Sequence, residues 1–323
     1  GLALASDRAS EETRPRVVAL LYVMYLLGMG LSALLIGWLL RDFTNVTLIR
    51  VVQGAALVGL LLNLVALWKQ EHMNPMSKEQ RSAPRPSFAK TWSAFMAEGT
   101  SARLILVVFL GTLAFNMQDV LLEPYGGEIL GLAVGQTTWL TAAWAFGALV
   151  GLAYAARRLK AGLSAYRLMS NSIFVGLLAF PAVIVSAPIG STTLFFAGAF
   201  LIGLGSGLFA VATLIAAMLL GETEHTSHGL ALGAWGASQA TSAGLAIALG
   251  GTLRDWINTL AMRGDLGETL ATPATGYSFV YHLEIAVLIV TLAILVPLVR
   301  MAQRTQSKSD HGNSGIKLAD FPM

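Results

Sequence analysis

The sequence predicts an all-α protein, a polytopic bundle of helices that crosses a membrane. Apolar residues make up 55% of the 323 positions and charged residues only 12%, a balance typical of multi-pass membrane proteins. Apolar segments of bilayer-spanning length recur along the chain. They lack the strict alternation of apolar and polar residues that a membrane barrel requires, which excludes that class.

Eight segments are long and apolar enough to be transmembrane helices. They lie at about 17–40, 46–68, 103–123, 134–156, 168–188, 192–220, 229–251 and 279–299. The intervening loops on one side of the predicted membrane carry 17 Lys and Arg residues and those on the other side carry 4. By the positive-inside rule the first set is cytoplasmic, and the C-terminus lies with it.

Two stretches of the chain, 5–37 and 220–250, share an order of features. Each has an apolar helix end, an acidic loop and a helix rich in small residues. If this is a repeat, residues 1–68 hold the end of an N-terminal half with two transmembrane helices, and residues 103–300 hold a complete C-terminal half of six. About four helices would then precede Gly1, as parallel repeats of the major-facilitator type require. An ordinary eight-helix bundle is the alternative.

The segment between these halves, residues 69–102, is polar and contains three prolines, which predicts a cytoplasmic linker. Within it, apolar residues at helical spacing predict a short amphipathic helix that either lies on the membrane surface or packs beneath the bundle. These residues are Phe88, Trp92, Phe95 and Met96. Residues 301–323 are polar and are predicted to form a disordered cytoplasmic tail.

A polar and acidic run closes the third predicted span. Asp119 and Glu123 are four residues apart and Asn116 is three before Asp119, so on a helix they share one face. Carboxylates at membrane depth are costly, so their presence predicts a site for a proton, a cation or a metal. The alternative is that the pair caps a turn in the hydrated headgroup layer. Because Glu123 precedes Pro124, we expect the helix to break there, before Gly126.

The last predicted helix opens with Tyr281, His282, Leu283 and Glu284. A neutral imidazole in an apolar setting can supply the fifth ligand of a magnesium tetrapyrrole, which makes His282 a candidate. A hydrogen-bonded interface histidine is the more ordinary interpretation. On a regular helix Glu284 points away from His282 and is not its partner.

Other chemistry is not indicated by the sequence. It has no phosphate-binding loop, no nucleophile elbow and no zinc-protease motif, which predicts that the protein is not an enzyme and binds no nucleotide. The absence of cysteine rules out disulfides and thiolate metal sites. The net charge of +3 follows from the loop asymmetry and does not indicate nucleic acid.

Three blocks of sequence resemble the PucC/LhaA family of light-harvesting complex assembly proteins from purple phototrophic bacteria, a divergent branch of the major facilitator superfamily. The most specific runs from Met117 to Gly127, with Gln118, Asp119, Glu123 and Tyr125 inside it; the others are 1–18 and 22–29. The resemblance implies a twelve-helix major-facilitator-like fold, of which this chain holds the C-terminal part with eight helices.

The same resemblance implies a function in antenna assembly in the photosynthetic intracytoplasmic inner membrane. The expected cofactor is bacteriochlorophyll, with carotenoid as a further candidate. The expected partners are the light-harvesting α/β polypeptides and membrane lipids, with the reaction centre–antenna complex and pigment-synthesis enzymes as further candidates.

The candidate ligand- or pigment-binding residues are Asn116, Gln118, Asp119, Glu123, Tyr125, His282 and Glu284, with His282 as the possible magnesium ligand. Three functions remain open: an assembly factor that binds or delivers bacteriochlorophyll or antenna polypeptides, a proton-coupled secondary transporter that uses Asp119 and Glu123, and a structural subunit at the edge of an antenna ring.

Overall fold

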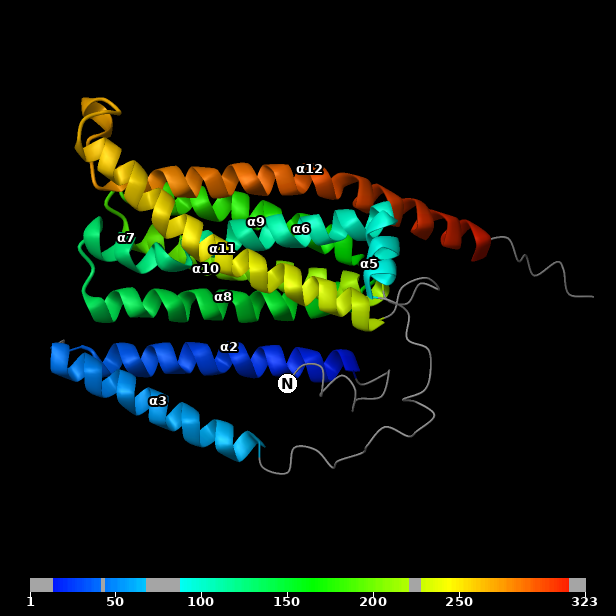
Figure 1. The fold of residues 1–323 in the computed structure, drawn as a ribbon, viewed down its shortest axis with the longest axis horizontal. Coiled ribbons are helices and arrows are strands. Elements are labelled where there is room, and N and C mark those ends of the chain that lie inside the picture. Colours follow the sequence, from blue (N-terminus) through cyan, green and yellow to red (C-terminus); the bar gives the residue numbers. More distant parts are fainter. Residues whose placement is uncertain (1–13, 42–43, 68–87, 221–227, 314–323) are drawn as a thin grey trace, which may run out of the picture.

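A computed structural model describes residues 14–41, 44–67, 88–220 and 228–313. Within these ranges the chain is all-α, as predicted (Figure 1). The elements are α2 (Arg14–Leu39), α3 (Asn45–Leu67), α5 (Phe88–Ala97), α6 (Gly99–Asn116), the 3-10 helix η1 (Met117–Val120), α7 (Leu122–Glu128), α8 (Val134–Lys160), α9 (Ala165–Ser186), α10 (Thr192–Leu220), α11 (His228–Met262), η2 (Glu268–Leu270) and α12 (Ala274–Asn313). The first sequence block of the family resemblance, except its last residues, and most of the 69–102 segment lie outside the described residues.

Seven of the eight predicted spans each coincide with one helix, and the span 103–123 covers α6, η1 and the start of α7. By length and composition, six helices among the described residues can cross a membrane: Asn45–Ala66, Gly99–Glu128, Val134–Lys160, Ala165–Ser186, Thr192–Leu220 and Ala274–Gln303. The apolar part of α2, Val23–Leu39, is shorter. α11 does not meet the same criterion, so the structure supports a multi-pass membrane protein with six clear spans.

The tightest packing in the bundle joins α8 to α10. A Cβ atom on Gly203 of α10 would collide with the Trp144 carbonyl of α8, and one on Gly147 of α8 would collide with the Phe200 carbonyl of α10. Close backbone approach of this kind gains van der Waals energy in lipid, where no hydrophobic force drives helices together. The two glycines therefore fix how α8 lies against the centre of the bundle.

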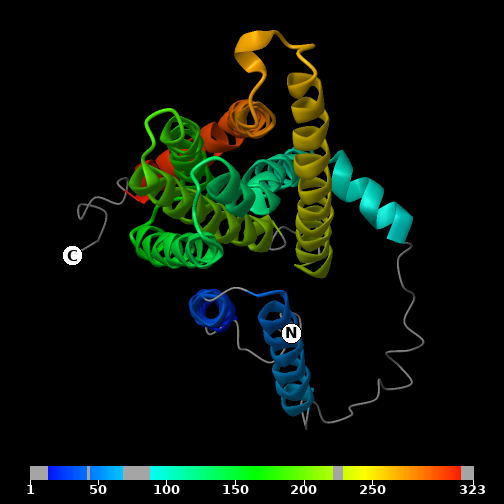
Figure 2. The same cartoon turned by 90° about the vertical axis from the view of Figure 1, so that its left-hand side faces the viewer.

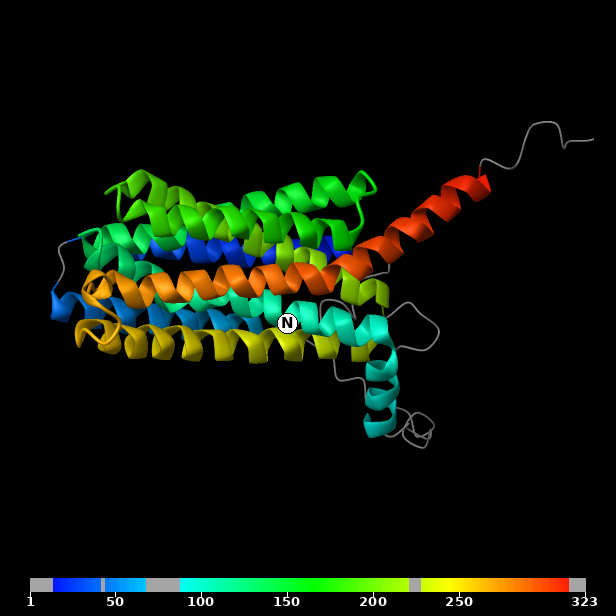
Figure 3. The ribbon, with the colours of Figure 1, turned by 90° about the horizontal axis from the view of Figure 1, so that it is seen from above.

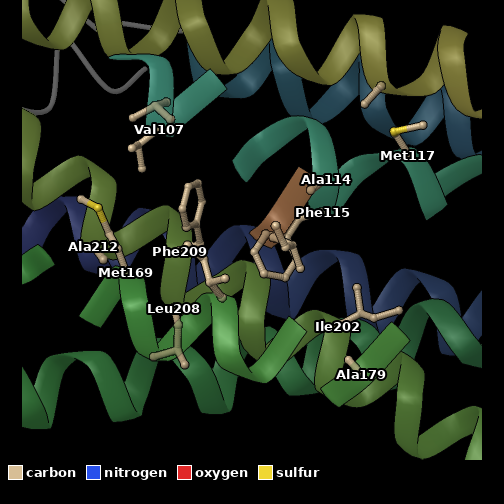
Figure 4. Packing of buried hydrophobic residues seen from close by; sticks show 14 of the residues in the cluster. Val107, Ala114, Phe115, Met117, Met169, Ala179, Ile202, Leu208, Phe209 and Ala212 are labelled. Carbon is tan, nitrogen blue, oxygen red and sulfur yellow. The ribbon is translucent and has the colours of Figure 1, made fainter. Parts of the chain in front are cut away.

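A core of aromatic and aliphatic side chains lies between α6, α9 and α10 (Figure 4). Phe115, near the end of α6, is 2% exposed, and its ring lies 5.8 Å from that of Phe209 and 6.4 Å from that of Phe180. This packing holds the C-terminal end of α6 inside the bundle. The polar run that follows α6 is positioned by that anchor.

Two predictions about the ends of the bundle are decided by the structure. α5 runs roughly perpendicular to the bundle helices at one end of the bundle (Figures 2 and 3), and its Phe95 is 3% exposed within the main core cluster. The alternative in which this helix packs against the bundle is therefore favoured. The predicted disorder from residue 301 is wrong for its first part, because α12 continues as a helix to Asn313 beyond the bundle (Figure 3). Polar composition ends the apolar span but does not end the helix.

Candidate functional site

The polar run that follows α6 forms a broken helix. α6 ends at Asn116, η1 covers Met117–Val120, and α7 begins at Leu122. The break was predicted at Glu123–Pro124, which is wrong: Pro124 is the third residue of α7 and Gly126 lies inside it. The first turn of a helix leaves its N–H groups without intrahelical partners, so proline is accommodated there.

Four of the predicted site residues line one cavity of about 310 Å³ between α2, the broken helix and α8. They are Asn116, Gln118, Asp119 and Glu123. The remaining lining residues are Tyr25, Met29, Leu122, Thr141 and Trp144. The predicted gathering of Asn116, Asp119 and Glu123 on one side is therefore confirmed, although a 3-10 turn replaces the regular helix.

The two carboxylates of the cavity have separate neutral partners. The Gln118 amide Nε2 donates to Asp119 Oδ1 over 2.5 Å, and Thr141 Oγ1 of α8 donates to Glu123 Oε1 over 2.6 Å. Neither carboxylate forms an ion pair within the part of the chain that the structure describes. Negative charge in this cavity is therefore balanced only by hydrogen-bond donors, which favours a ligand that brings donors or a positive charge.

A second cavity of about 150 Å³ adjoins the first and shares Tyr25, Asn116 and Trp144 with it. It extends between α6, α10 and α11, where Thr112, Ser206 and Gln239 add polar groups. Thr112 Oγ1 and Trp144 Nε1 are buried and have no hydrogen-bond partner among the described residues. These orphaned groups can receive polar atoms of a ligand or water.

Thr112, Thr141 and Trp144 were missed by sequence reasoning. The available signal was the presence of neutral polar side chains within apolar spans, which often form interhelical hydrogen bonds. That signal does not tell which of many such residues face a cavity.

Tyr125 does not join the cavity. It is 3% exposed and packs edge-on against Tyr277 and Tyr281 of α12, with ring centroids 5.3 and 5.6 Å away. Phe195 lies 5.5 Å from it on a third side. Its position suits aromatic packing that joins α7 to α12 more than contact with a ligand in the cavity.

His282 and Glu284 lie on opposite sides of α12, as predicted. Glu284 is 0% exposed, whereas His282 is exposed on the outside of the helix. His282 Nδ1 lies 2.7 Å from the Ser278 carbonyl oxygen. Ser278 Oγ also lies 3.3 Å from Nδ1. A carbonyl can only accept, so the tautomer that satisfies the carbonyl contact has its proton on Nδ1 and leaves Nε2 as the acceptor nitrogen.

A further cluster at the α7 end of the bundle was not predicted. The Arg254 guanidinium of α11 pairs with the Glu128 carboxylate of α7, and its Nη2 donates to Tyr277 Oη over 2.6 Å. Tyr277 Oη in turn donates to Glu128 Oε2 over 2.8 Å. The Arg254 guanidinium also lies 4.2 Å from the centre of the Tyr277 ring. Three helices are joined here by one charge-assisted network.

The sequence matches the family model described as PUCC protein over residues 1–303. It is 57% identical over 322 residues to a protein of Rhodobacter capsulatus called "Uncharacterized protein in puhA-bchM intergenic region", covering 100% of this chain and 67% of that protein. It is 44% identical to Protein PucC of the same organism, covering 94% of this chain and 65% of that protein. The chain thus spans about two thirds of the length of these relatives.

The fold is similar to a solved transporter structure. With a TM-score of 0.59 and 17% sequence identity, 95% of this chain and 74% of the other chain superpose. That structure is the crystal structure of a bacterial homologue of the human lysosomal transporter Spinster, in an inward-facing and unoccupied conformation. This likeness confirms a major-facilitator-like fold.

Proposed function

Because this chain belongs to the PucC protein family, we propose that it acts as an assembly factor for bacterial light-harvesting antenna complexes, without catalysing a reaction. In this proposal it binds bacteriochlorophyll, and carotenoid as a second candidate, in the photosynthetic inner membrane with its C-terminus in the cytoplasm. Its partners are the single-helix α/β antenna polypeptides. The reaction centre–antenna complex and pigment-synthesis enzymes are further candidates.

The observation that carries the pigment-binding part is the geometry of His282. A magnesium tetrapyrrole needs a neutral imidazole nitrogen that faces an open, apolar region. His282 fits this need in the tautomer whose Nδ1 donates to the Ser278 carbonyl, because Nε2 is then the free ligand nitrogen of an exposed ring. The residues one turn on either side, Ser278 and Ala286, are small and leave room for a macrocycle beside the imidazole.

The surroundings of His282 are suited to a lipid-facing pigment. Phe279, Ile289 and Val290 of the same helix are exposed apolar side chains. In a membrane span, such side chains contact lipid or an apolar ligand. When bound, the pigment would supply light absorption, and the chain itself would only hold and orient it.

Pigment retention tests this proposal. We expect protein purified gently from phototrophic membranes to show a near-infrared absorption band, and His282→Leu to lose most of it. Ser278→Ala is the matched control, because it removes the hydroxyl 3.3 Å from Nδ1 but keeps the backbone carbonyl 2.7 Å from it. Resonance Raman spectra of the retained pigment would report five-coordinate magnesium. A band of unchanged intensity in His282→Leu would contradict the ligand role.

The cellular role is tested separately. Deletion of the gene should selectively remove one antenna absorption band, and the wild-type gene should restore it. Unchanged antenna spectra would contradict the assembly role. Stoichiometric co-purification with an antenna ring that survives stringent washing would instead support a structural subunit.

One observation favours a second function, a proton-coupled secondary transporter. The fold is similar to that of a transporter homologue, and Asp119 and Glu123 line one cavity, which is open on one side. In this case substrate flux in reconstituted vesicles should depend on a pH gradient and should vanish in Asp119→Asn. Antenna loss on gene deletion without any such flux would favour the assembly factor.

A further inference from the structure

Glu284 is buried in the bundle without a polar partner. Its exposure is 0%, and neither Oε1 nor Oε2 has a hydrogen-bond partner among the described residues. It lies ten residues after α12 begins at Ala274, about 15 Å along the helix axis. Within the span Ala274–Gln303 an ionised carboxylate in this state would be strongly destabilising.

The groups nearest to Glu284 link it to the cavity. Glu284 lies within electrostatic range of Asp119 and of the Gln118 backbone amide, although the amide does not form a hydrogen bond with either carboxyl oxygen, and α12 packs against η1, which carries both residues. The Gln118 side chain, 2% exposed, donates its Nε2 proton to Asp119 and leaves its Oε1 buried without a partner. Gln118 therefore adjoins two carboxyl groups. That of Asp119 faces the cavity, and that of Glu284 is buried in the bundle.

Among the residues whose side chains the structure describes, no Lys or Arg forms an ion pair with Glu284. α12 packs against α6, α9, α11 and η1, and Asp119 of η1 is the acidic group of the described residues that acts on Glu284. Tyr281 of α12 is buried beside it with an unpartnered Oη. Arg254 of α11 is engaged by Glu128, Asp255 and Tyr277.

A metal ion is also not favoured at this position. Among the described residues, no three His, Asp or Glu side chains come together in a way that could hold one. A carboxyl group with no partner suits a proton, which needs only one acceptor oxygen. The proton is therefore the remaining way to neutralise Glu284.

We propose that Glu284 is an internal proton-binding site, filled from the 310 Å³ cavity by way of Asp119. A hydronium ion in the cavity gives its proton to the Asp119 carboxylate, and Glu284 then takes that proton. Asp119 returns to its ionised form, so the net change is one proton moved from the cavity to Glu284. Gln118 holds Asp119 in position and neither gains nor loses a proton. This site is independent of pigment binding at His282.

Infrared spectroscopy of the intact protein tests the site directly. A protonated carboxyl in an apolar environment has a C=O stretch separate from carboxylate and amide bands. We expect this band in the wild-type protein near neutral pH and its loss in Glu284→Gln. Glu123→Gln is the matched control, since Glu123 lies on α7 of the broken helix and, unlike Glu284, accepts a hydrogen bond from Thr141. Absence of the band in wild type, or its survival in Glu284→Gln, would overturn the proposal.

The route is tested by isotope exchange. After transfer to heavy water, the band should shift as Glu284 exchanges its proton. We expect Asp119→Asn to slow this shift severalfold and Thr141→Ser to leave it unchanged. An unchanged exchange rate in Asp119→Asn would refute entry through Asp119.

A labelling experiment covers the case in which Glu284→Gln does not fold. Dicyclohexylcarbodiimide reacts with protonated carboxyl groups in apolar surroundings. In wild-type protein at neutral pH, peptide mapping should find the label on Glu284 and not on Glu128, which is paired with Arg254. Labelling of Glu128 but not Glu284 would contradict the proposal.

Discussion

Thr141 of α8 donates a hydrogen bond of 2.6 Å to the Glu123 carboxylate of α7. This contact fixes the position of Glu123 at the wall of the cavity. Asp119 has a different donor, the Gln118 amide. The pair joins two elements that flank the polar cavity. Its removal would leave a partly buried carboxylate without its neutral donor.

Thr141→Val should therefore lower the free energy of unfolding by about 1 kcal/mol, whereas Thr141→Ser should keep the hydrogen bond and leave the free energy of unfolding nearly unchanged. Valine keeps the shape of threonine but lacks the hydroxyl, and serine keeps the hydroxyl. Denaturation of the purified protein in detergent micelles measures the difference. Equal losses in the two variants would show that the methyl group, and not the hydrogen bond, matters.

Gly203→Ala should destabilise the protein by about 1–3 kcal/mol, because the added methyl meets the backbone of α8 at Trp144. Gly236→Ala on α11 is the matched control. A Cβ there meets nothing within 4 Å, so the change should be neutral or slightly stabilising. Thermal unfolding of both variants in the same detergent measures this contrast, and a Gly203→Ala midpoint equal to wild type would contradict the close approach of α8 and α10.

Tyr277→Phe should weaken the network that joins α7, α11 and α12, because Arg254 and Glu128 each lose a hydrogen bond to Tyr277 Oη. We expect a loss of about 1–2 kcal/mol in unfolding free energy. Tyr154→Phe, at an exposed position on α8, is the comparison and should change stability little. If both substitutions had the same small effect, the network would not contribute to stability.

Phe95→Ala should release α5 from the bundle, because its buried ring is the anchor of this short helix. Truncation of a buried phenylalanine costs about 3 kcal/mol or more. Limited proteolysis should then cut within α5 faster than in the wild type. Ala97→Ser at an exposed position is the control, and an unchanged cleavage rate in Phe95→Ala would favour a helix held by the membrane surface instead.

The helices could be predicted from sequence because a bilayer sets both their length and their apolar character. The same reasoning failed at the end of α12, which continues to Asn313 through polar sequence, since a helix does not need lipid to persist. It also misplaced the helix break near Pro124. Pro124 lies in the first turn of α7, where N–H groups have no intrahelical acceptor, so the absence of an N–H on proline costs no hydrogen bond.

Within the candidate site, sequence spacing alone determined that Asn116, Asp119 and Glu123 lie on one side, because residues three and four apart are neighbours on a helical path. It also determined that His282 and Glu284 face opposite ways. Only the tertiary structure decided that Glu123 meets Thr141, that Glu284 is fully buried in the bundle, and that Tyr125 turns to α12. Those contacts join residues from different helices, and they depend on how each helix is rotated and packed, which local sequence does not encode.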